Sequence, residues 1–336
     1  MPRTALAVAL AAALPLVWAG SAAAAPGGLG PPKPQSPSGE TIYEIYWVVF
    51  AICAVVFVLV EATLVLFALR FRRRRRTPLD AEGPQIHGNT RLEVIWTLIP
   101  AVILAGIAVY AIARTPAVQA TPERGEALRV RVESHQFYWQ YVYPNGVVSL
   151  DTLRLPVDRP VSLELVSLDV NHSWWVPELT GKRDAIPGQV NVLSFRPERT
   201  GTYDGECAEF CGIQHAVMYT EVEVLEPEAF EAWLAETRAG QQGEALELGQ
   251  ATWEAACAKC HGLEGEGDIG PPIAGSGTLT DREALVQLLE TGQNTPDLPG
   301  YMPPVGLGWP GFQYDALIAY IESSPTLRGG DEQDGG

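Results

Sequence analysis

The run Cys207-Ala-Glu-Phe-Cys211-Gly-Ile-Gln-His215-Ala-Val-Met218 places two thiols, an imidazole and a thioether within one short segment. Thiolate and thioether ligands favour copper, whereas imidazole suits copper, iron or zinc. A mononuclear blue-copper site needs one cysteine, two histidines and a weak axial methionine. Because this run offers two cysteines, it predicts two bridging thiolates that hold two copper ions.

A second imidazole must come from elsewhere in the chain. His172, in the stretch Asp169-Val-Asn-His-Ser-Trp-Trp-Val-Pro177, is the expected distant ligand. Two other interpretations stay open. Cys207 and Cys211 can form a disulfide in an oxidising compartment, and zinc is the rival metal, although its structural sites are built from cysteine and histidine rather than methionine.

Short strand-like segments lie on both sides of these ligands. Several of them alternate apolar and polar residues, and Pro-Asn-Gly, Pro-Gly and Thr-Gly turns separate them; the segments are 129–132, 137–143, 161–166, 190–195 and 219–224. Short strands at such spacing predict an all-β sandwich. We expect a Greek-key arrangement that holds the copper ligands at one end.

The string Cys257-Ala-Lys-Cys260-His261 is a second redox signature. Such a string supplies two thioether attachment points for haem and an axial imidazole, although a redox dithiol shares its Cys-x-x-Cys part. Pro271 follows at a distance where its carbonyl can accept the ring N–H of His261, as groups around metal ligands do. Met302 offers a sixth ligand, and His/Met ligation suits electron transfer.

The N-terminal part of the chain carries a targeting segment and two membrane spans. One arginine, an apolar run and then small residues predict a secretory signal peptide. Each of the two apolar stretches that follow is long enough to cross a bilayer, which takes about 20 residues. Five consecutive arginines, 72–76, lie between them, so the positive-inside rule places this loop in the cytoplasm and the rest of the chain outside.

These patterns predict a multi-domain protein with two transmembrane α-helices, an all-β domain and an all-α class I cytochrome c domain. The expected order is signal peptide (1–25), flexible lead-in (26–42), transmembrane helix 1 (43–70), cytoplasmic Arg-rich loop (71–92), transmembrane helix 2 (93–114), β-domain (124–226), amphipathic helix and linker (227–244), cytochrome c domain (245–326) and disordered acidic tail (327–336).

Charge gives a further indication of partners. The formal net charge is −17, from 40 acidic and 23 basic residues, and such a surface attracts a basic partner and repels nucleic acid.

Glu61 lies inside the first span, where a carboxylate is expected to face a partner helix. Glu93, at the cytoplasmic mouth of the second span, is a candidate for proton uptake. His87 and His135 are expected to be structural.

Residues from Tyr43 to Leu225 resemble subunit II of haem-copper cytochrome c oxidases, and residues from Ala245 onward resemble a fused cytochrome c domain. The resemblance implies that the β-domain is cupredoxin-like and holds a dinuclear copper centre, CuA. The implied copper ligands are His172, Cys207, the backbone carbonyl of Glu209, Cys211, His215 and Met218. The implied haem c site uses Cys257 and Cys260 for covalent attachment, with His261 and Met302 as axial ligands.

The resemblance also implies partners and a path for electrons. An external donor (a cytochrome c or a quinol-cytochrome c reductase) would reduce haem c, and electrons would pass through CuA to subunit I, where oxygen is reduced to water and protons are pumped. The chain would be an oxidoreductase and translocase subunit without the oxygen-reducing site. It would lie in the bacterial inner membrane, among lipid and other oxidase subunits, with its C-terminal domains on the periplasmic side.

Three single residues complete the comparison with the family. The Glu209 side chain matches a carboxylate that binds magnesium at the subunit I interface, and Asp184 falls in the same region. Glu93 matches the start of a proton channel into subunit I. Phe137 departs from the family, which often has tryptophan there to accept the electron of soluble cytochrome c; Tyr138 or Trp139 is the expected substitute.

Overall fold

The structure is a computed structural model that describes residues 30–71, 85, 87–118, 127–243, 245–293 and 301–329. The expected signal peptide and the arginine run 72–76 lie outside the described residues. The chain divides into two compact units, Glu40–Val118 and the remainder. Each unit is described by itself.

Two long apolar helices make up the first unit. Helix α2 spans Pro37–Arg70 and helix α3 spans Thr90–Val118, and both are long and apolar enough to cross a membrane. Their large apolar side chains are exposed rather than packed into a core, which is the expected condition of side chains that face lipid. Glu44 and Arg114 form an ion pair between the helices. The two predicted spans are confirmed.

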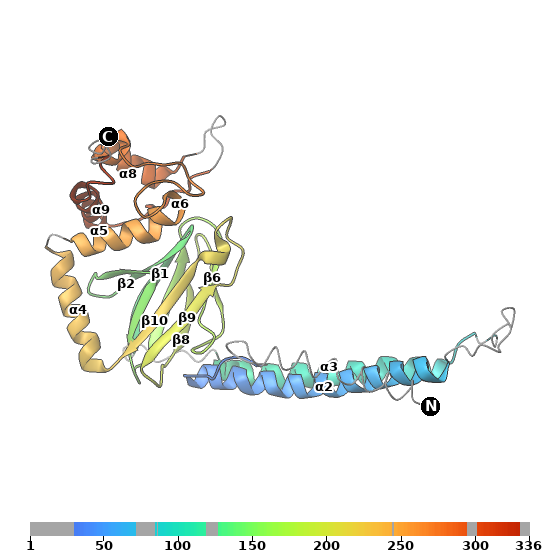
Figure 1. The fold of residues 1–336 in the computed structure, drawn as a ribbon. Helices are drawn as coiled ribbons and strands as arrows, with labels where there is room; N and C mark the ends of the chain where they lie inside the picture. Colours follow the sequence, from blue (N-terminus) through green and yellow to red (C-terminus); the bar gives the residue numbers. More distant parts are fainter. Residues whose placement is uncertain are drawn as a thin grey trace, which may run out of the picture. The chain divides into compact units, whose positions relative to one another are not determined.

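The second unit begins with a two-layer β-sandwich (Figure 1). One sheet has the order β3-β2-β1-β5-β8 and the other β4-β10-β9-β6-β7. The strands are β1 (Leu128–His135), β2 (Tyr138–Val142), β3 (Val148–Leu150), β4 (Thr152–Pro156), β5 (Val161–Ser167), β6 (His172–Trp175), β7 (Arg183–Ala185), β8 (Asn191–Phe195), β9 (Gly201–Cys207) and β10 (Tyr219–Leu225). The predicted sandwich is therefore confirmed.

The core of the sandwich forms from alternate residues of its strands. In β1, Val130 and Val132 are fully buried while Arg129 and Arg131 point outward, as the period of two requires. The parallel pairings of β1 with β5 and of β4 with β10 join strands that are distant in sequence. Each of these pairings is reached by connections that pass from one sheet to the other. The sandwich is therefore not a simple up-and-down arrangement of strands.

Helices make up the C-terminal part of the second unit. They are α4 (Pro227–Gln241), α5 (Leu246–Thr252), the π-helical turn η2 (Trp253–Ala258), α6 (Lys259–His261), α7 (Gly277–Thr280), α8 (Arg282–Thr291) and α9 (Gly311–Ser323). Helix α4 runs beside the sandwich, and α5 lies near β2 (Figure 1). Helices α5 and α9 cross at Gly249, where an added Cβ would lie 2.1 Å from the carbonyl oxygen of Ala316. Only glycine at position 249 lets the two helices approach this closely.

Both ends of the second unit differ from the sequence-based prediction. Residues 26–42 were expected to be flexible, yet the Gln35 N–H donates to the Glu178 carbonyl at 2.7 Å, and α2 already begins at Pro37. The tail was expected to start at residue 327, but Leu327 is 1% exposed and its carbonyl accepts the Gly275 N–H. Hydrogen bonds therefore hold the described parts of both segments, whereas residues 26–29 and 330–336 lie outside the described residues.

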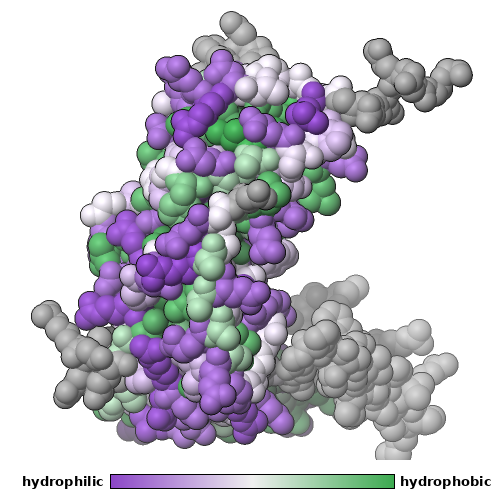
Figure 2. Space-filling model, turned by 90° about the vertical axis from the view of Figure 1, so that its left-hand side faces the viewer, coloured by the Kyte–Doolittle hydropathy of each residue, from purple (hydrophilic) through white to green (hydrophobic). Residues whose placement is uncertain are grey.

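Hydrophilic side chains cover most of the face drawn in Figure 2, over both the β-sandwich and the C-terminal helices. This face agrees with the acidic composition of the chain. The described part of the second unit therefore combines an apolar interior with a mainly hydrophilic surface on this face.

Candidate metal centres

The copper-ligand run forms the loop between two paired strands. Strand β9 ends at Cys207, a short 3-10 turn η1 spans His215–Val217, and β10 follows directly after Met218. The Cys207 N–H donates to the Met218 carbonyl at 3.0 Å, which closes the base of the loop. Because β6 pairs with β9, with Trp174 opposite Cys207, His172 at the start of β6 is brought to the same end of the sandwich.

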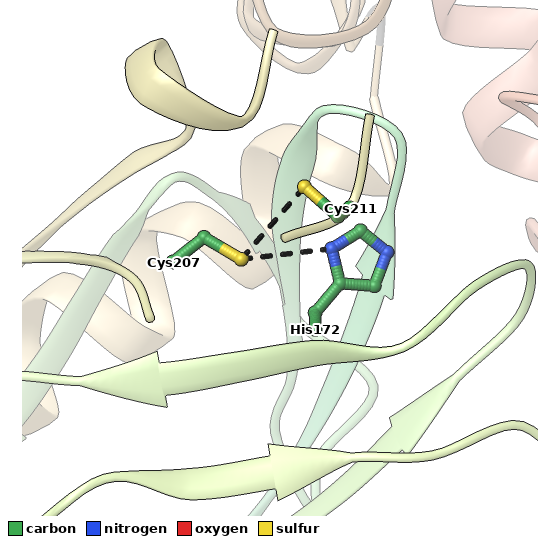
Figure 3. Close-up of side chains that lie close together, drawn as sticks. All are labelled: His172, Cys207 and Cys211. Carbon is green, nitrogen blue, oxygen red and sulfur yellow. Dashed lines mark hydrogen bonds between the residues drawn. The ribbon is translucent and has the colours of Figure 1, made fainter. Parts of the chain in front are cut away.

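The thiols of Cys207 and Cys211 point toward each other, and a ring nitrogen of His172 faces Cys207 (Figure 3). Cys207 Sγ lies 3.8 Å from Cys211 Sγ and 3.9 Å from His172 Nδ1. On the other side, Cys211 Sγ lies 3.7 Å from His215 Nδ1 and 3.8 Å from Met218 Sδ. The carbonyl oxygen of Glu209 is 3.2 Å from Cys207 Sγ. The structure thus brings together all six groups that the sequence assigns to copper.

The two thiols are buried and unpaired. All five cysteines of the chain are free, so Cys207 and Cys211 do not form a disulfide in this structure. The hydrogen bond between the two thiols lowers the pKa of Cys207 and raises that of Cys211. Thiolate is the form of cysteine that binds metal, and soft donors gathered in one buried pocket fit copper better than a hard cation.

Asp169 holds His172 in position, a role that the sequence-based prediction missed. Its carboxylate lies 2.8 Å from His172 Nε2 and also accepts the Gln136 N–H at 2.6 Å. Burial lowers the pKa of His172, but the hydrogen bonds to Asp169 and Cys207 outweigh it and the net pKa is raised. A carboxylate on the far nitrogen of a ligating histidine is a recurrent feature of metal sites. The three-residue spacing of Asp169 and His172 could have revealed it.

The carboxylates expected to bind magnesium lie beside a lysine. Lys182 Nζ is 3.5 Å from Glu209 Oε2 and 3.6 Å from Asp184 Oδ1. Oxygen donors of this kind suit magnesium, but the ammonium group already provides a positive charge between them. The donor set therefore fits a magnesium ion only in part.

The second predicted site lies on the short helical turns that follow α5. Cys257 is on η2, and Cys260 and His261 are on α6. His261 Nδ1 lies 2.7 Å from the Pro271 carbonyl, as the sequence predicts, so the ring can donate this N–H and leave Nε2 for iron. A Cβ on Gly270 would lie 2.9 Å from the His261 ring; only glycine lets the loop approach this closely.

The surroundings of these residues fit a haem. The site lies in an apolar cluster of buried residues that includes Trp253, Cys257, Leu279, Leu285, Leu289, Val305 and Trp309, with Met302 packed against it. Met302 is held by paired backbone hydrogen bonds with Gln293. Burial raises the pKa of Cys257 to about 12. Apolar surroundings with one oriented imidazole and one thioether suit the His/Met ligation of haem c.

Among the remaining candidates, Glu93 and His135 have local contacts, whereas His87 and Glu61 are exposed. The Glu93 carboxylate accepts the Asn89 N–H at 3.3 Å at the start of α3, which gives it a structural role whether or not it takes up protons. His135 is fully buried and stacks on Tyr138, His87 is exposed, and Glu61 is exposed on α2. Phe137 is only 6% exposed.

Comparison with known proteins gives the family. The family described as "Cytochrome C oxidase subunit II, periplasmic domain" matches residues 147–225, and the one described as "Cytochrome C oxidase subunit II, transmembrane domain" matches 24–113. A "Cytochrome c oxidase subunit 2" of Alkalihalophilus pseudofirmus is 32% identical, with 88% of this chain and 90% of that protein covered. The chain belongs to the cytochrome c oxidase subunit 2 family.

Two further relatives match part of the chain. A "Cytochrome c oxidase subunit 2" of Cereibacter sphaeroides is 30% identical, with 64% of this chain and 82% of that protein covered. The crystal structure of the periplasmic domain of subunit II of cytochrome oxidase of Bradyrhizobium japonicum is 27% identical, with 33% of this chain and 94% of that chain covered, at a TM-score of 0.33.

A separate family covers the C-terminal part of this subunit II chain. The family described as "Cytochrome C oxidase, cbb3-type, subunit III" matches residues 244–321, which agrees with the predicted cytochrome c domain. Together the matches imply a CuA copper centre in the periplasmic domain and a haem c in the C-terminal domain. They also imply a membrane-anchored protein of a haem-copper oxidase complex.

Proposed function

We propose that this chain is the electron-transfer subunit of a haem-copper oxidase and carries electrons from an external donor to subunit I. Electrons are accepted at the haem c site of Cys257, Cys260, His261 and Met302. They leave through the copper site of the β9–β10 loop toward subunit I, where oxygen is reduced to water and protons are pumped. The chain itself contributes no oxygen-reducing site to this proposal.

One observation supports the proposal most directly: two buried free thiols, two imidazoles and a thioether meet at the end of the sandwich. These residues would hold a pair of copper ions, which would accept and pass on single electrons. The residues of the chain prepare the site: Asp169 orients His172, and the closed base of the loop holds Cys207 beside Met218. A rigid ligand frame keeps the rearrangement on electron transfer small.

The haem end is prepared in a similar way. A bound haem c supplies an iron that alternates between two oxidation states. Pro271 fixes the orientation of the His261 ring, and the buried apolar cluster excludes water from it. Exclusion of water and His/Met ligation both raise the potential of an iron site, which suits an acceptor for electrons from a respiratory donor.

The membrane location and two finer roles also belong to this proposal. We infer that the chain lies in the bacterial inner membrane with its Arg-rich loop in the cytoplasm. Glu93 then lies on the side from which protons are taken up. Glu209 and Asp184 would bind magnesium together with groups of subunit I, provided that Lys182 moves away from them.

Two other functions are less well supported by the site. A quinol oxidase subunit II would need no copper ligands, yet the full donor set is present and converges here. A copper-containing reductase of nitrogen oxides would need a catalytic domain of its own. The families that match the chain are the two subunit II domains and a cytochrome domain, although quinol oxidase subunit 2 proteins are also similar to 61% of the chain, at 27% identity.

Metal and haem content of the purified full-length chain tests the proposal. We expect about two coppers and one covalently bound haem per chain, as the ligand count requires. Cys207→Ser should abolish the copper signal in optical and electron paramagnetic resonance spectra while the haem stays. Cys53→Ser is the matched control, because Cys53 is exposed on α2. Zinc, or no metal, in the wild-type loop would reject the proposal.

A further inference from the structure

The cytochrome domain is packed on the β-domain through a buried polar interface. Strand β2 is buried on both faces: Trp139 and Tyr141 belong to the core of the sandwich, whereas Tyr138 belongs to the apolar cluster of the C-terminal domain. The Tyr138 hydroxyl donates to the Val305 carbonyl at 2.5 Å and accepts the Trp309 indole N–H at 2.7 Å.

A second contact lies beside this one. The side-chain amide of Gln313 donates to Gln140 Oε1 at 2.9 Å, and both residues are fully buried. Buried polar groups of this kind are paired in nearly all proteins, because an unpaired one costs free energy. The Tyr138 hydroxyl, the Trp309 N–H and the facing amide atoms of Gln140 and Gln313 are paired across the two domains, so these three hydrogen bonds favour one orientation of the domains.

Lys259 extends this interface to the haem-attachment segment. It lies between the two attachment cysteines in sequence, and its ammonium donates to Asp151 Oδ2 at 2.6 Å and to the Phe137 carbonyl at 3.0 Å. Lys259 and Asp151 are 23% and 29% exposed. A partly buried ion pair is favourable when its geometry is good. The two short contacts of Lys259 therefore hold α6 against the start of β2.

Gln214 connects the same segment to the copper loop. It directly precedes His215, and its side-chain amide donates to the Lys259 carbonyl. Its Oε1 lies 3.7 Å from Cys260 Sγ. One residue of the copper loop therefore contacts both the backbone and the thiol of the haem-attachment segment.

We propose that Lys259 and Gln214 are positioning residues that lock the haem site against the copper loop, so that the cytochrome domain transfers electrons from a fixed, docked position rather than by swinging on its linker. The proposal rests on the proposed function. One electron moves per transfer: the haem site is oxidised, the copper site is reduced, and no bond is made or broken in the chain.

The test uses the full-length chain with both metals bound. The variants are Gln214→Met, Lys259→Met and the double variant, and the control is Arg282→Met, which breaks the exposed ion pair of Arg282 with Asp315. Three quantities are measured: copper and haem content, deuterium uptake by the amides of residues 138–150, and the rate at which an electron placed on the haem by a photoreductant reaches the copper.

We expect the double variant to keep both metals. Transfer should slow by roughly tenfold, because each lost contact removes about 1 kcal/mol that holds the cytochrome domain in its docked position. Deuterium uptake in β2 and β3 should rise about tenfold as the interface opens more often. Arg282→Met should change neither quantity. Gln214→Met leaves the charge near the haem unchanged. If electron transfer is slower in this variant while the reduction potentials of both metal sites are unaltered, the cause is positioning and not a smaller driving force.

Unchanged transfer and unchanged deuterium uptake in the double variant would overturn the proposal. If the double variant loses haem or copper, Gln214→Met alone decides, because Gln214 is not a metal ligand. Failure of the proposed function is a different result: it would appear as wild-type protein without copper or haem, before any variant is compared.

Discussion

Single side chains set the chemistry of the two metal centres. Asp169 fixes one ring nitrogen of His172 and turns the other toward Cys207. The Pro271 carbonyl does the same for His261. In both centres an oxygen outside the ligand set decides which nitrogen is available, and such partners commonly change metal affinity about 10- to 100-fold.

His135 provides a pH-dependent test at the residue scale. Burial lowers its pKa from 6.5 to about 4, and neither ring nitrogen has a hydrogen-bond partner among the described residues. Between about pH 4 and pH 6.5, His135 binds a proton in the unfolded chain but not in the folded domain. The stabilisation by neutral His135 is therefore complete above about pH 6.5 and is lost as the pH falls toward 4, by about 3 kcal/mol in total.

Urea unfolding of the chain at several pH values measures this effect. His135→Phe keeps an aromatic ring to stack on Tyr138 and removes the titrating group, so its free energy of unfolding should depend less on pH across this range. Equal pH dependence in the variant and the wild type would show that His135 does not titrate as its burial requires.

At the scale of elements, close backbone approach explains where glycine is needed. Helices α5 and α9 meet at Gly249, and a Cβ there would lie 2.7 Å from Tyr320 Cβ in addition to its contact with the Ala316 carbonyl. The helix pair frames the haem cluster, which contains Trp253 and Leu317. Its crossing distance therefore affects the packing of the whole C-terminal domain.

Gly249→Ala should destabilise the C-terminal domain by about 1–3 kcal/mol, the usual cost of overpacking a core. Thermal unfolding followed at the haem absorption band measures this change. Gly240→Ala is the matched control, since Gly240 lies in α4 and a Cβ there meets nothing within 4 Å. This control should be neutral or stabilise the chain by about 0.5–1 kcal/mol. Equal effects of the two substitutions would argue against the tight crossing.

For the whole molecule, charge determines which donors approach it. With a net charge of −17, the chain attracts cations over about one Debye length, which is about 10 Å at 0.1 M salt. The surface drawn in Figure 2 is largely hydrophilic. If Lys259 holds the cytochrome domain in place, an external donor meets this domain rather than the Phe137 region of the sandwich.

Reduction of the haem by a basic soluble cytochrome c should therefore depend on salt. The second-order rate constant should fall at least about tenfold between low and physiological ionic strength, as in other steered associations. Stopped-flow absorbance measures it, and an acidic donor should show the opposite trend. A rate independent of salt would mean that the acidic surface does not guide the donor.

The sequence alone predicted two metal sites and the order of the domains. Cys207, Cys211 and His215 lie close along the chain, so their spacing predicts the copper loop, and the Cys-x-x-Cys-His string predicts the haem site. Only the tertiary structure decided which groups surround them. Asp169 accepts the distant Gln136 N–H while it holds His172, the Leu327 carbonyl accepts the Gly275 N–H, and Gln140 pairs with Gln313. These contacts join segments that are far apart along the chain, and no periodicity or motif within one segment encodes them.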